Sequence, residues 1–221
     1  MKLSVLISVL NEEHTVMQML EQVLAVPVEK ELVVVDDGSS DKTWEVLQQL
    51  HDPRVRTYRH KTNLGKGSGI RTALEHATGD WVIIQDADLE YDPNDYPRLI
   101  APILDGRAQV VYGARDLDRQ SLTFRLGNKF LTWCTNVLYS AKISDMETCY
   151  KLMPREVMLS LGLLPTRFQI EPEITAKLLR RGYKIYEVPI WYKPRKAKKL
   201  SAWKDGLPAL WTLIKYRFAS V

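Results

Sequence analysis

The first half of the chain alternates between short apolar runs and longer amphipathic segments. Apolar runs of this length predict buried strands, and segments of about ten residues with helical periodicity predict helices between them. The expected strands are Leu3–Val9, Leu32–Val35, Val55–Arg59, Trp81–Ile84 and Val110–Tyr112, and the expected helices are Glu12–Leu24, Asp41–Leu50, Lys66–Ala77 and Tyr96–Leu104. Strands that alternate with helices indicate βαβ units. We therefore predict an α/β fold with a mainly parallel sheet sandwiched by helices.

The pattern changes after Gly113, where the segments become longer and richer in aromatic and basic residues. The elements expected here are an amphipathic helix over Leu122–Ser140, a helix over Glu173–Arg181, a strand over Tyr183–Val188, a basic loop over Pro194–Lys199 and a last amphipathic helix over Trp203–Phe218. No internal repeat and no Gly/Ser-rich or Pro-rich linker divides the chain. We therefore expect a single domain over residues 1–221, in which the second half elaborates the sheet of the first.

Length and composition narrow the class of protein. The chain has 221 residues, of which 45% are hydrophobic and 26% charged, and these are globular proportions. No apolar run reaches the roughly 18 residues of a membrane span, and Glu12 and Glu13 come too early for a signal peptide. Two cysteines, Cys134 and Cys149, do not suggest a disulfide framework. These features together lead us to expect a cytoplasmic protein.

Charge is distributed unevenly along the chain. The formal net charge is +4, but residues 177–221 contain 12 Lys and Arg against 2 Asp and Glu. A segment of this kind predicts an anionic partner, which would be a polyanion, a phosphate group or an anionic membrane surface. A solvated basic helix without a partner is the alternative.

Polar or glycine-rich clusters follow each of the five strands expected in the first half. They are Asn11–Glu13, Asp36–Ser40, Asn63–Gly69, Asp86–Asp88 and Gly113–Arg115. In open parallel sheets, ligands bind beyond the carboxyl ends of the strands. We therefore expect the functional site at this edge of the sheet. Within it, Asp37 is a candidate to bind a ribose or base edge and Lys66 to meet a phosphate.

The sharpest chemical signal is Asp86-Ala87-Asp88, directly after an apolar strand. Alternate residues of an extended chain point to the same side, so both carboxylates would face one site. Two close carboxylates repel unless a proton or a cation lies between them. Oxygen ligands suit Mg²⁺ or Mn²⁺, which in turn hold substrate phosphates. The alternative is that these acids cap the turn and helix that follow.

The order and spacing of these clusters resemble the family-2 glycosyltransferases of the GT-A fold. The resemblance is greatest to the branch that includes dolichol-phosphate mannose synthase and polyprenyl-phosphate glucosyltransferases, and it extends through Asp145–Lys151 and Glu171–Ile174. It implies an inverting, metal-dependent transfer of a hexose from a donor of the UDP-glucose or GDP-mannose type to a polyprenyl or dolichyl phosphate. Residues 1–115 would bind the nucleotide sugar and residues 116–221 the acceptor, and no nucleic acid is expected as a partner.

The resemblance also implies roles for single residues. Asp86, Asp88 and Asp145 would be catalytic, and Asp86, Asp88 and Glu90 would hold the Mg²⁺ or Mn²⁺ ion. The residues expected to bind the nucleotide sugar are Ser8, Leu10, Glu12, Asp37, Lys66, Ala87, Arg115, Arg125, Glu171, Arg195 and Lys199.

Two other enzyme functions fit parts of the pattern. A glycosyltransferase that acts on a sugar hydroxyl needs a carboxylate base, for which Asp145 or Glu171 is the candidate. A nucleotidyltransferase also uses paired acids on an α/β sheet. However, Asn11–Glu13 stands where its Gly-rich basic loop after the first strand would be.

The last predicted helix suggests how the chain reaches a lipid. Its apolar face consists of Trp203, Leu207, Leu210, Trp211, Ile214 and Phe218, and its flanking cations are Lys204, Lys215 and Arg217. This arrangement is typical of a helix that lies in the headgroup region of an anionic membrane. We therefore expect peripheral attachment to the cytoplasmic face of a membrane. Packing of this face on the protein's own core, or in the seam of a homodimer, is the alternative.

Overall fold

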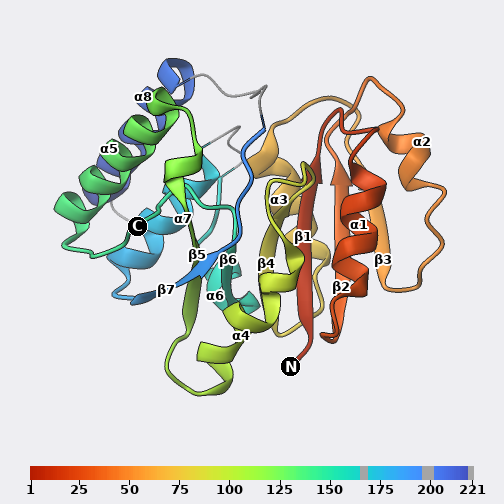
Figure 1. Ribbon diagram of the computed structural model, residues 1–221, viewed down its shortest axis with the longest axis horizontal. Helices are drawn as coiled ribbons and strands as arrows, with labels where there is room; N and C mark the ends of the chain where they lie inside the picture. The colour runs from red at the N-terminus through yellow and green to blue at the C-terminus, as the bar shows by residue number, and fades with distance from the viewer. Residues whose placement is uncertain (165–168, 196–201, 219–221) are drawn as a thin grey trace.

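The computed structural model describes residues 1–164, 169–195 and 202–218, with residues 202–205 described by their backbone alone. A twisted sheet runs through the molecule, and helices cover both of its faces (Figure 1). The strands are β1 Leu3–Val9, β2 Lys30–Asp36, β3 Val55–Arg59, β4 Trp81–Asp86, β5 Val110–Arg115, β6 Lys151–Pro154 and β7 Ile185–Ile190. The helices are α1 Val16–Ala25, α2 Thr43–Leu47, α3 Lys66–His76, α4 Tyr96–Leu104, α5 Leu122–Tyr139, α6 Arg155–Ser160, α7 Ile170–Arg180 and α8 Ala202–Phe218, with short 3₁₀ turns η1 Pro93–Asp95 and η2 Leu117–Arg119.

The strand order is β3-β2-β1-β4-β6-β5-β7, and every pairing is parallel except those of β6. Every residue of β2 is buried, as are all but one of β1, because helices pack on both sides of these strands. The expected α/β fold with a mainly parallel sheet is confirmed.

The sequence analysis missed β6 and α6, and it ended β4 and β5 too early. Asp86 is the last residue of β4 and pairs with Ser8, and Arg115 is the last residue of β5 and pairs with Ile190. The prediction that these polar residues follow their strands is therefore wrong. Backbone pairing with a neighbouring strand continues past the point where the apolar run stops.

Several element ends also differ from the prediction. α1 begins at Val16 instead of Glu12, because residues 12–15 form a turn in which Glu12 accepts a hydrogen bond from the Thr15 hydroxyl at 2.7 Å. α2 is confined to Thr43–Leu47, and β7 lies two residues later than expected, over Ile185–Ile190. Within the described residues, no helix combines the length and hydrophobicity needed to cross a bilayer.

A second, smaller core joins α5, α7 and α8. It contains Leu131, Ile143, Met146, Ala176, Ala209, Leu213 and Tyr216. The inward face of α8 is therefore Ala209, Leu213 and Tyr216, next to the face that the sequence analysis singled out. On that other face, Leu207, Trp211 and Phe218 are 64%, 66% and 77% exposed. Leu210 and Ile214 are partly buried, and the side chains of Trp203 and Lys204 lie outside the described residues.

Candidate active site

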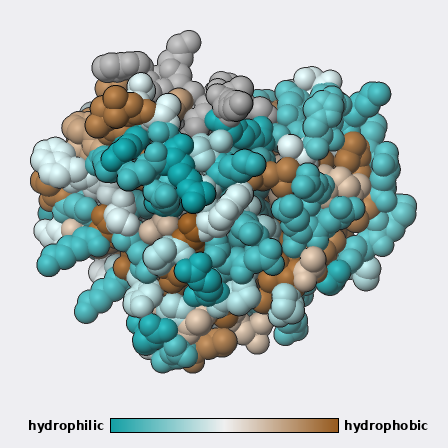
Figure 2. Space-filling view, viewed as in Figure 1, coloured by the Kyte–Doolittle hydropathy of each residue, from teal (hydrophilic) through white to brown (hydrophobic). Residues whose placement is uncertain are grey.

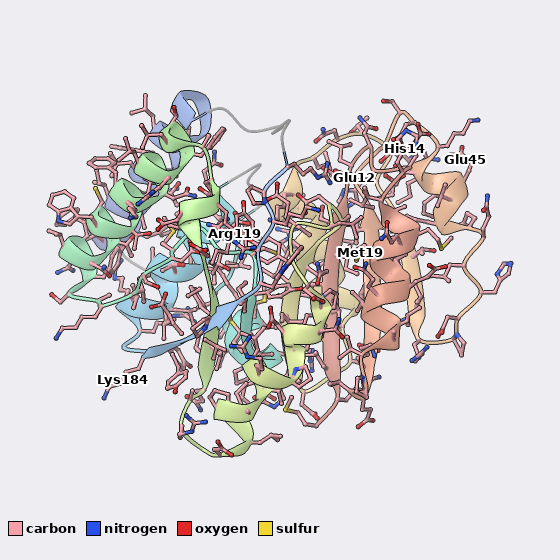
Figure 3. All side chains as sticks on the ribbon, in the orientation of Figure 1. Glu12, His14, Met19, Glu45, Arg119 and Lys184 are labelled. Carbon is pink, nitrogen blue, oxygen red and sulfur yellow. The ribbon has the colours of Figure 1, made fainter. Side chains whose placement is uncertain are left out.

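The carboxyl ends of the parallel strands meet at the upper edge of the sheet in Figure 1. Most of the residues expected to bind a ligand gather there. Figure 3 shows Glu12 at this edge, whereas Lys184, which precedes β7, lies at the lower left, away from it.

Lys66, the first residue of α3, joins two acids at this edge. Its Nζ lies 2.7 Å from Oδ1 of Asp86, at the end of β4, and 2.6 Å from Oε1 of Glu171, in the first turn of α7. Burial by itself would lower the pKa of this ammonium, but Asp86 and Glu171 outweigh burial and raise the pKa well above its ordinary value. Lys66 is therefore a permanent cation that links three elements.

Three acids, Asp86, Asp88 and Glu90, occupy the end of β4 and the turn after it. Burial raises the pKa of Asp88 to about 7, and the like charges of Asp86 and Glu90 add to this effect. A divalent cation would relieve the repulsion, and carboxylate oxygens are ligands that Mg²⁺ and Mn²⁺ accept. Asp86 and Asp88 therefore fit a partial metal site that phosphate oxygens would complete.

Glu90, the third expected metal ligand, is engaged elsewhere. Its Oε2 accepts a hydrogen bond from the Tyr192 hydroxyl at 2.8 Å, and its Oε1 accepts one from the backbone N–H of Arg195 at 2.9 Å. Among the residues that the structure describes, no three His, Cys, Asp or Glu side chains are grouped to hold a metal. Glu90 anchors the 192–195 segment here, and metal ligation by it stays a prediction.

Arg195 covers the acids after β4. One guanidinium nitrogen donates to Oε2 of Glu12 at 2.8 Å, and Nε donates to the carbonyl oxygen of Asp88 at 3.0 Å. Arg195 thus holds the loop after β1 against the turn after β4. Arg125, also expected to face phosphate, pairs with Asp118 at 2.9 Å instead. Lys199 lies outside the described residues.

Arg115 and Asp145 are buried against each other. The guanidinium donates to both carboxylate oxygens, at 2.7 and 2.8 Å, and the backbone N–H of Arg115 adds a third bond at 3.1 Å. The side chains are 7% and 1% exposed. Two residues that the sequence analysis expects to act on the donor therefore hold each other. The catalytic role expected for Asp145 stays a prediction.

Asp37 binds two loops together. Its Oδ1 accepts from Nδ1 of His60 and the backbone N–H of Leu64, and its Oδ2 accepts from the backbone N–H of Gly65 at 2.7 Å. The next residue, Gly38, has a positive φ of 73°, and a Cβ there would lie 2.6 Å from the carbonyl carbon of Thr62. Asp37 thus shapes the loop that leads into α3, at the place where it was expected to meet a nucleotide.

Of the remaining expected residues, Ser8 lies in β1, Leu10 directly follows β1, and Ala87 lies in the turn after β4. A Cβ at Gly69 of α3 would lie 2.1 Å from Oγ of Ser8, so Ser8 sits directly beneath this helix. Leu10 is partly buried, and Ala87 is 4% exposed and packs in the main core.

Lys151, to which the sequence analysis gave no role, is buried near Glu171 and Asp145. The buried ammonium donates to the carbonyl oxygens of Met146 and Thr148, at 2.7 and 2.6 Å, and lies 4.2 Å from the centroid of the Tyr112 ring. Burial lowers its pKa to about 8, although Glu171 and other nearby acids oppose the shift. In the sequence, the one sign of this buried lysine is its position directly before the short apolar stretch 152–154.

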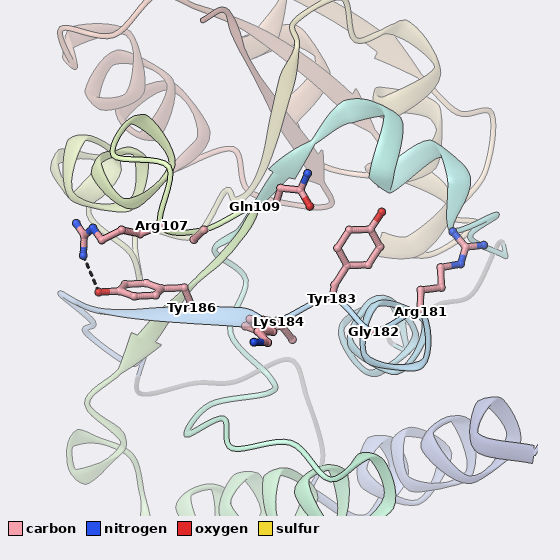
Figure 4. Close-up of a pocket in the computed structure, with 9 residues that line it drawn as sticks. Arg107, Gln109, Arg181, Gly182, Tyr183, Lys184 and Tyr186 are labelled. Atoms are coloured by element: carbon pink, nitrogen blue, oxygen red, sulfur yellow. Dashed lines mark hydrogen bonds between the residues drawn. The ribbon is translucent and has the colours of Figure 1, made fainter.

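A cavity of about 610 Å³ opens at the opposite edge of the sheet, where β5 and β7 begin (Figure 4). Residues 107–109 and 181–186 line it. Arg107 donates to the Tyr186 hydroxyl at 2.9 Å there. This cavity contains none of the expected site residues.

Comparison with known proteins gives the same family and fold. A sequence profile described as "Glycosyl transferase family 2" matches residues 4–158. The chain is 28% identical over 219 residues to the low-salt glycan biosynthesis hexosyltransferase Agl6 of Haloferax volcanii. This alignment covers 92% of this chain and 51% of that protein. The chain is also 34% identical over 176 residues to the bactoprenol glucosyl transferase of Shigella phage SfX, in an alignment that covers 76% of this chain and 57% of that protein.

A third relative is the undecaprenyl-phosphate 4-deoxy-4-formamido-L-arabinose transferase of Proteus mirabilis, 38% identical over 131 residues, or 56% of this chain and 40% of that protein. The chain spans about half the length of these curated relatives. A crystal structure of glucosyl-3-phosphoglycerate synthase from Mycobacterium tuberculosis with Mn²⁺, UDP and phosphoglyceric acid aligns with a TM-score of 0.78 and 19% identity, covering 100% of this chain and 80% of that one. At this identity, the likeness supports the fold alone.

Proposed function

The chain belongs to glycosyl transferase family 2, and from this premise we propose that it transfers a hexose from a nucleotide diphosphate sugar to a polyprenyl phosphate. The observation on which the proposal rests is that carboxylates and cations lie next to each other at the carboxyl edge of the sheet. Asp86 and Asp88 supply the acids, and Lys66 and Arg195 lie against them as cations.

The donor half of the reaction follows from these charges. Negative charge grows on the nucleoside diphosphate as it leaves, and neutralising that charge is the main electrostatic demand. A Mg²⁺ or Mn²⁺ ion held by Asp86 and Asp88 would supply part of the neutralisation. Lys66 binds a phosphate oxygen in exchange for Asp86, and Arg195 does the same in exchange for Glu12.

The acceptor half is supported by the state of the two candidate bases. Asp145 is held by Arg115, and Glu171 is held by Lys66 at 2.6 Å. A carboxylate already paired with a cation is a poor proton acceptor. A phosphate acceptor has a second pKa of about 6, so it is largely dianionic at neutral pH and needs no base. Its oxygen attacks the anomeric carbon as the diphosphate departs, which inverts the configuration.

An apolar surface formed by α5 and α8 supports a lipid-linked acceptor. Large side chains on α5 recur at intervals of 4, 4, 3 and 4 residues and are between 51% and 68% exposed; they are Leu122, Leu126, Phe130, Trp133 and Val137. Leu207, Trp211 and Phe218 extend this α5–α8 surface, and part of it forms the brown area at the upper left of Figure 2. Exposed apolar patches of this extent mark interaction sites.

The charges around the α5–α8 surface favour an anionic membrane as its partner. Lys129 lies on α5, and Lys215 and Arg217 lie on α8. α5 contains no Asp or Glu, and α8 contains one, Asp205. Each Lys or Arg near an anionic leaflet contributes about 1 kcal/mol of attraction. We therefore propose a peripheral protein on the cytoplasmic face of a membrane, with residues 1–221 acting as one domain. Burial of this surface in a homodimer is the competing arrangement.

The test uses the purified chain with Mn²⁺, undecaprenyl phosphate in detergent, and either UDP-glucose or GDP-mannose. We expect a hexosyl-phosphate lipid and free nucleoside diphosphate in equal amounts. Transfer only to a glycan hydroxyl would favour the glycan-modifying alternative. Formation of UTP or GTP from the nucleotide sugar when inorganic pyrophosphate is added would favour a nucleotidyltransferase. Undecaprenol without its phosphate is the matched control acceptor, and it should receive no sugar.

A further inference from the structure

The turn that contains Glu147 lies between α5 and β6, and hydrogen bonds with buried side chains hold its backbone in place. The Lys151 ammonium donates to the carbonyl oxygens of Met146 and Thr148, the residues on either side of Glu147, at 2.7 and 2.6 Å. The hydroxyl of Thr132 also accepts from the backbone N–H of Met146 at 3.2 Å. The backbone at Glu147 is therefore fixed by contacts within the protein itself.

The carboxylate of Glu147 differs from its backbone in having an oxygen without a partner among the described residues. Its Oε1 is buried and accepts no hydrogen bond from any residue that the structure describes. Buried carboxyl oxygens nearly always have a donor, because an unpaired one loses its hydration without compensation. A rigid backbone that carries an unpaired acceptor suits a group whose donor comes from a ligand.

Glu147 lies close enough to charged residues of the candidate active site to be affected by them. Burial and the like charge of Glu171 raise the pKa of Glu147 to about 7, while Lys151 and Arg115 oppose the shift. Glu171 is connected through Lys66 to Asp86. Neither nearby cation pairs with Glu147, since Arg115 donates to Asp145 and Lys151 donates to backbone carbonyls.

An unpaired acceptor needs a hydrogen-bond donor, and the proposed reactants differ in the donors that they offer. Phosphate dianions have only acceptor oxygens, so they offer no hydrogen-bond donor to Oε1 of Glu147. Sugar hydroxyl groups donate hydrogen bonds, carry no charge and occur on every hexose. We propose that Glu147 binds a hydroxyl group of the transferred hexose and thereby helps to select the sugar. This inference rests on the proposed function.

If Glu147 binds one sugar hydroxyl, the effect of replacing Glu147 should depend on whether that hydroxyl is present and should not depend on the other hydroxyls. The experiment therefore pairs Glu147→Ala with UDP-glucose and its 2-, 3-, 4- and 6-deoxy analogues, or with the corresponding GDP-mannose series if that donor is used. We expect removal of one hydroxyl to lower kcat/KM in the wild type by about 10-fold or more and to have little further effect in Glu147→Ala. The affinity for UDP alone, measured by calorimetry, should be unchanged.

Two further variants control the experiment. Glu147→Gln keeps an acceptor oxygen and should restore most of the discrimination. Glu156→Ala changes an exposed glutamate on α6 and should behave as wild type. We also expect Glu147→Ala to keep or raise the urea midpoint of unfolding, because it removes a buried unpaired oxygen. A structural residue would lower that midpoint and leave the sugar preference unchanged.

Three results would overturn the inference. The first is a folded, active Glu147→Ala enzyme whose response to every deoxy analogue equals that of the wild type. The second is an equal loss of affinity for UDP and for UDP-glucose, which would place Glu147 at the nucleotide. The third is intact donor binding with turnover reduced about 1,000-fold in Glu147→Gln, which would make it a proton acceptor. Absence of nucleotide-sugar binding by the wild type would instead refute the proposed function itself.

Discussion

Lys66 and Asp86 form an ion pair of 2.7 Å where the first turn of α3 meets the end of β4. The same ammonium lies 2.6 Å from Glu171, so one cation serves two acids from different parts of the chain. A donor diphosphate and its metal would compete with both partners of this pair: the metal for Asp86 and the phosphate for Lys66. We therefore propose that the ion pair keeps both groups in place for an exchange of partners when the donor binds.

Replacement of the acids after β4 tests the metal site. Asp88→Asn removes one charge from a turn residue without changing its shape, so we expect the fold to persist and transfer to fall by at least about 100-fold. Asp86→Asn should have the same effect. Initial rates of transfer at several Mn²⁺ concentrations measure it, with EDTA as a reversible equivalent. Full activity of the wild type in EDTA would contradict the metal assignment.

Lys66→Met tests the partner exchange. The variant removes the cation expected to bind a donor phosphate, and we expect the affinity for UDP or GDP to fall by about 1.5–3 kcal/mol, the range for hydrogen bonds to charged groups. Calorimetry with the nucleoside diphosphate and Mn²⁺ measures the change. Lys61→Met, at an exposed position in the loop before α3, is the matched control and should bind normally. Equal affinities in both variants would rule out this role for Lys66.

The pair Arg115 and Asp145 is expected to contribute mainly to stability. Removing one partner of a buried ion pair leaves the other charge uncompensated and costs about 3–5 kcal/mol. We expect Asp145→Asn to lower the free energy of unfolding, measured in urea, while measurable turnover remains. If turnover disappears while stability is unchanged, Asp145 acts directly in catalysis.

Glu31 gives the protein a defined acid sensitivity. Burial disfavours its charge, but hydrogen bonds from Ser4, Thr78 and Lys2 outweigh burial and lower the pKa of Glu31 from 4.5 to about 2. The pKa in the folded state lies below that of the unfolded chain, so the stabilisation is complete above about pH 5 and is lost as the pH falls toward 2. In urea titrations, Glu31→Gln should be less stable than wild type at pH 7, and the difference should shrink below pH 4. A constant difference across this range would contradict the assignment.

The α5–α8 surface predicts binding to anionic vesicles. Trp133 and Trp211 are 60% and 66% exposed, so the double variant Trp133→Ser/Trp211→Ser should fold normally. We expect its co-sedimentation with vesicles of phosphatidylglycerol to fall by about 10-fold or more, and high salt to weaken binding of the wild type. Leu104→Ser, which changes an exposed leucine on α4, is the control. Dimerisation of the wild type that is lost in the double variant would favour the homodimer seam instead.

Local pattern was enough to predict much of the sheet and the gathering of Asp86, Asp88 and Glu12 at one edge. β1 and β2 are buried on both faces, so their apolar runs are unambiguous. The missed strand β6 has four residues and begins with a lysine, which hides it from any apolar count. The buried lysine is tolerated because two backbone carbonyls accept hydrogen bonds from its ammonium. These contacts depend on the folded chain, so the pattern of apolar residues does not reveal them.

The sequence also did not reveal which residues pair with the charged site residues, because these pairs form only in the folded chain. Arg115 and Asp145 each carry a charge suited to a ligand, and only the fold makes them partners of each other. Lys66 likewise meets Glu171 through a contact between α3 and α7. On α8, the sequence analysis identified the apolar positions, of which Leu207, Trp211 and Phe218 are exposed. The helix turns Ala209, Leu213 and Tyr216 inward.

The antiparallel strand β6 has a consequence for how the chain is synthesised and how it evolves. β6 pairs with β4 on one side and with β5 on the other, so β5 has no place in the sheet until residues 151–154 have left the ribosome. Until then the nascent chain carries an open edge at β4, of the kind to which chaperones and other unpaired strands bind. A recombination event at residue 115 would separate β5 from the strand that joins it to the sheet. The two halves of the chain are therefore expected to be inherited together and not exchanged as modules.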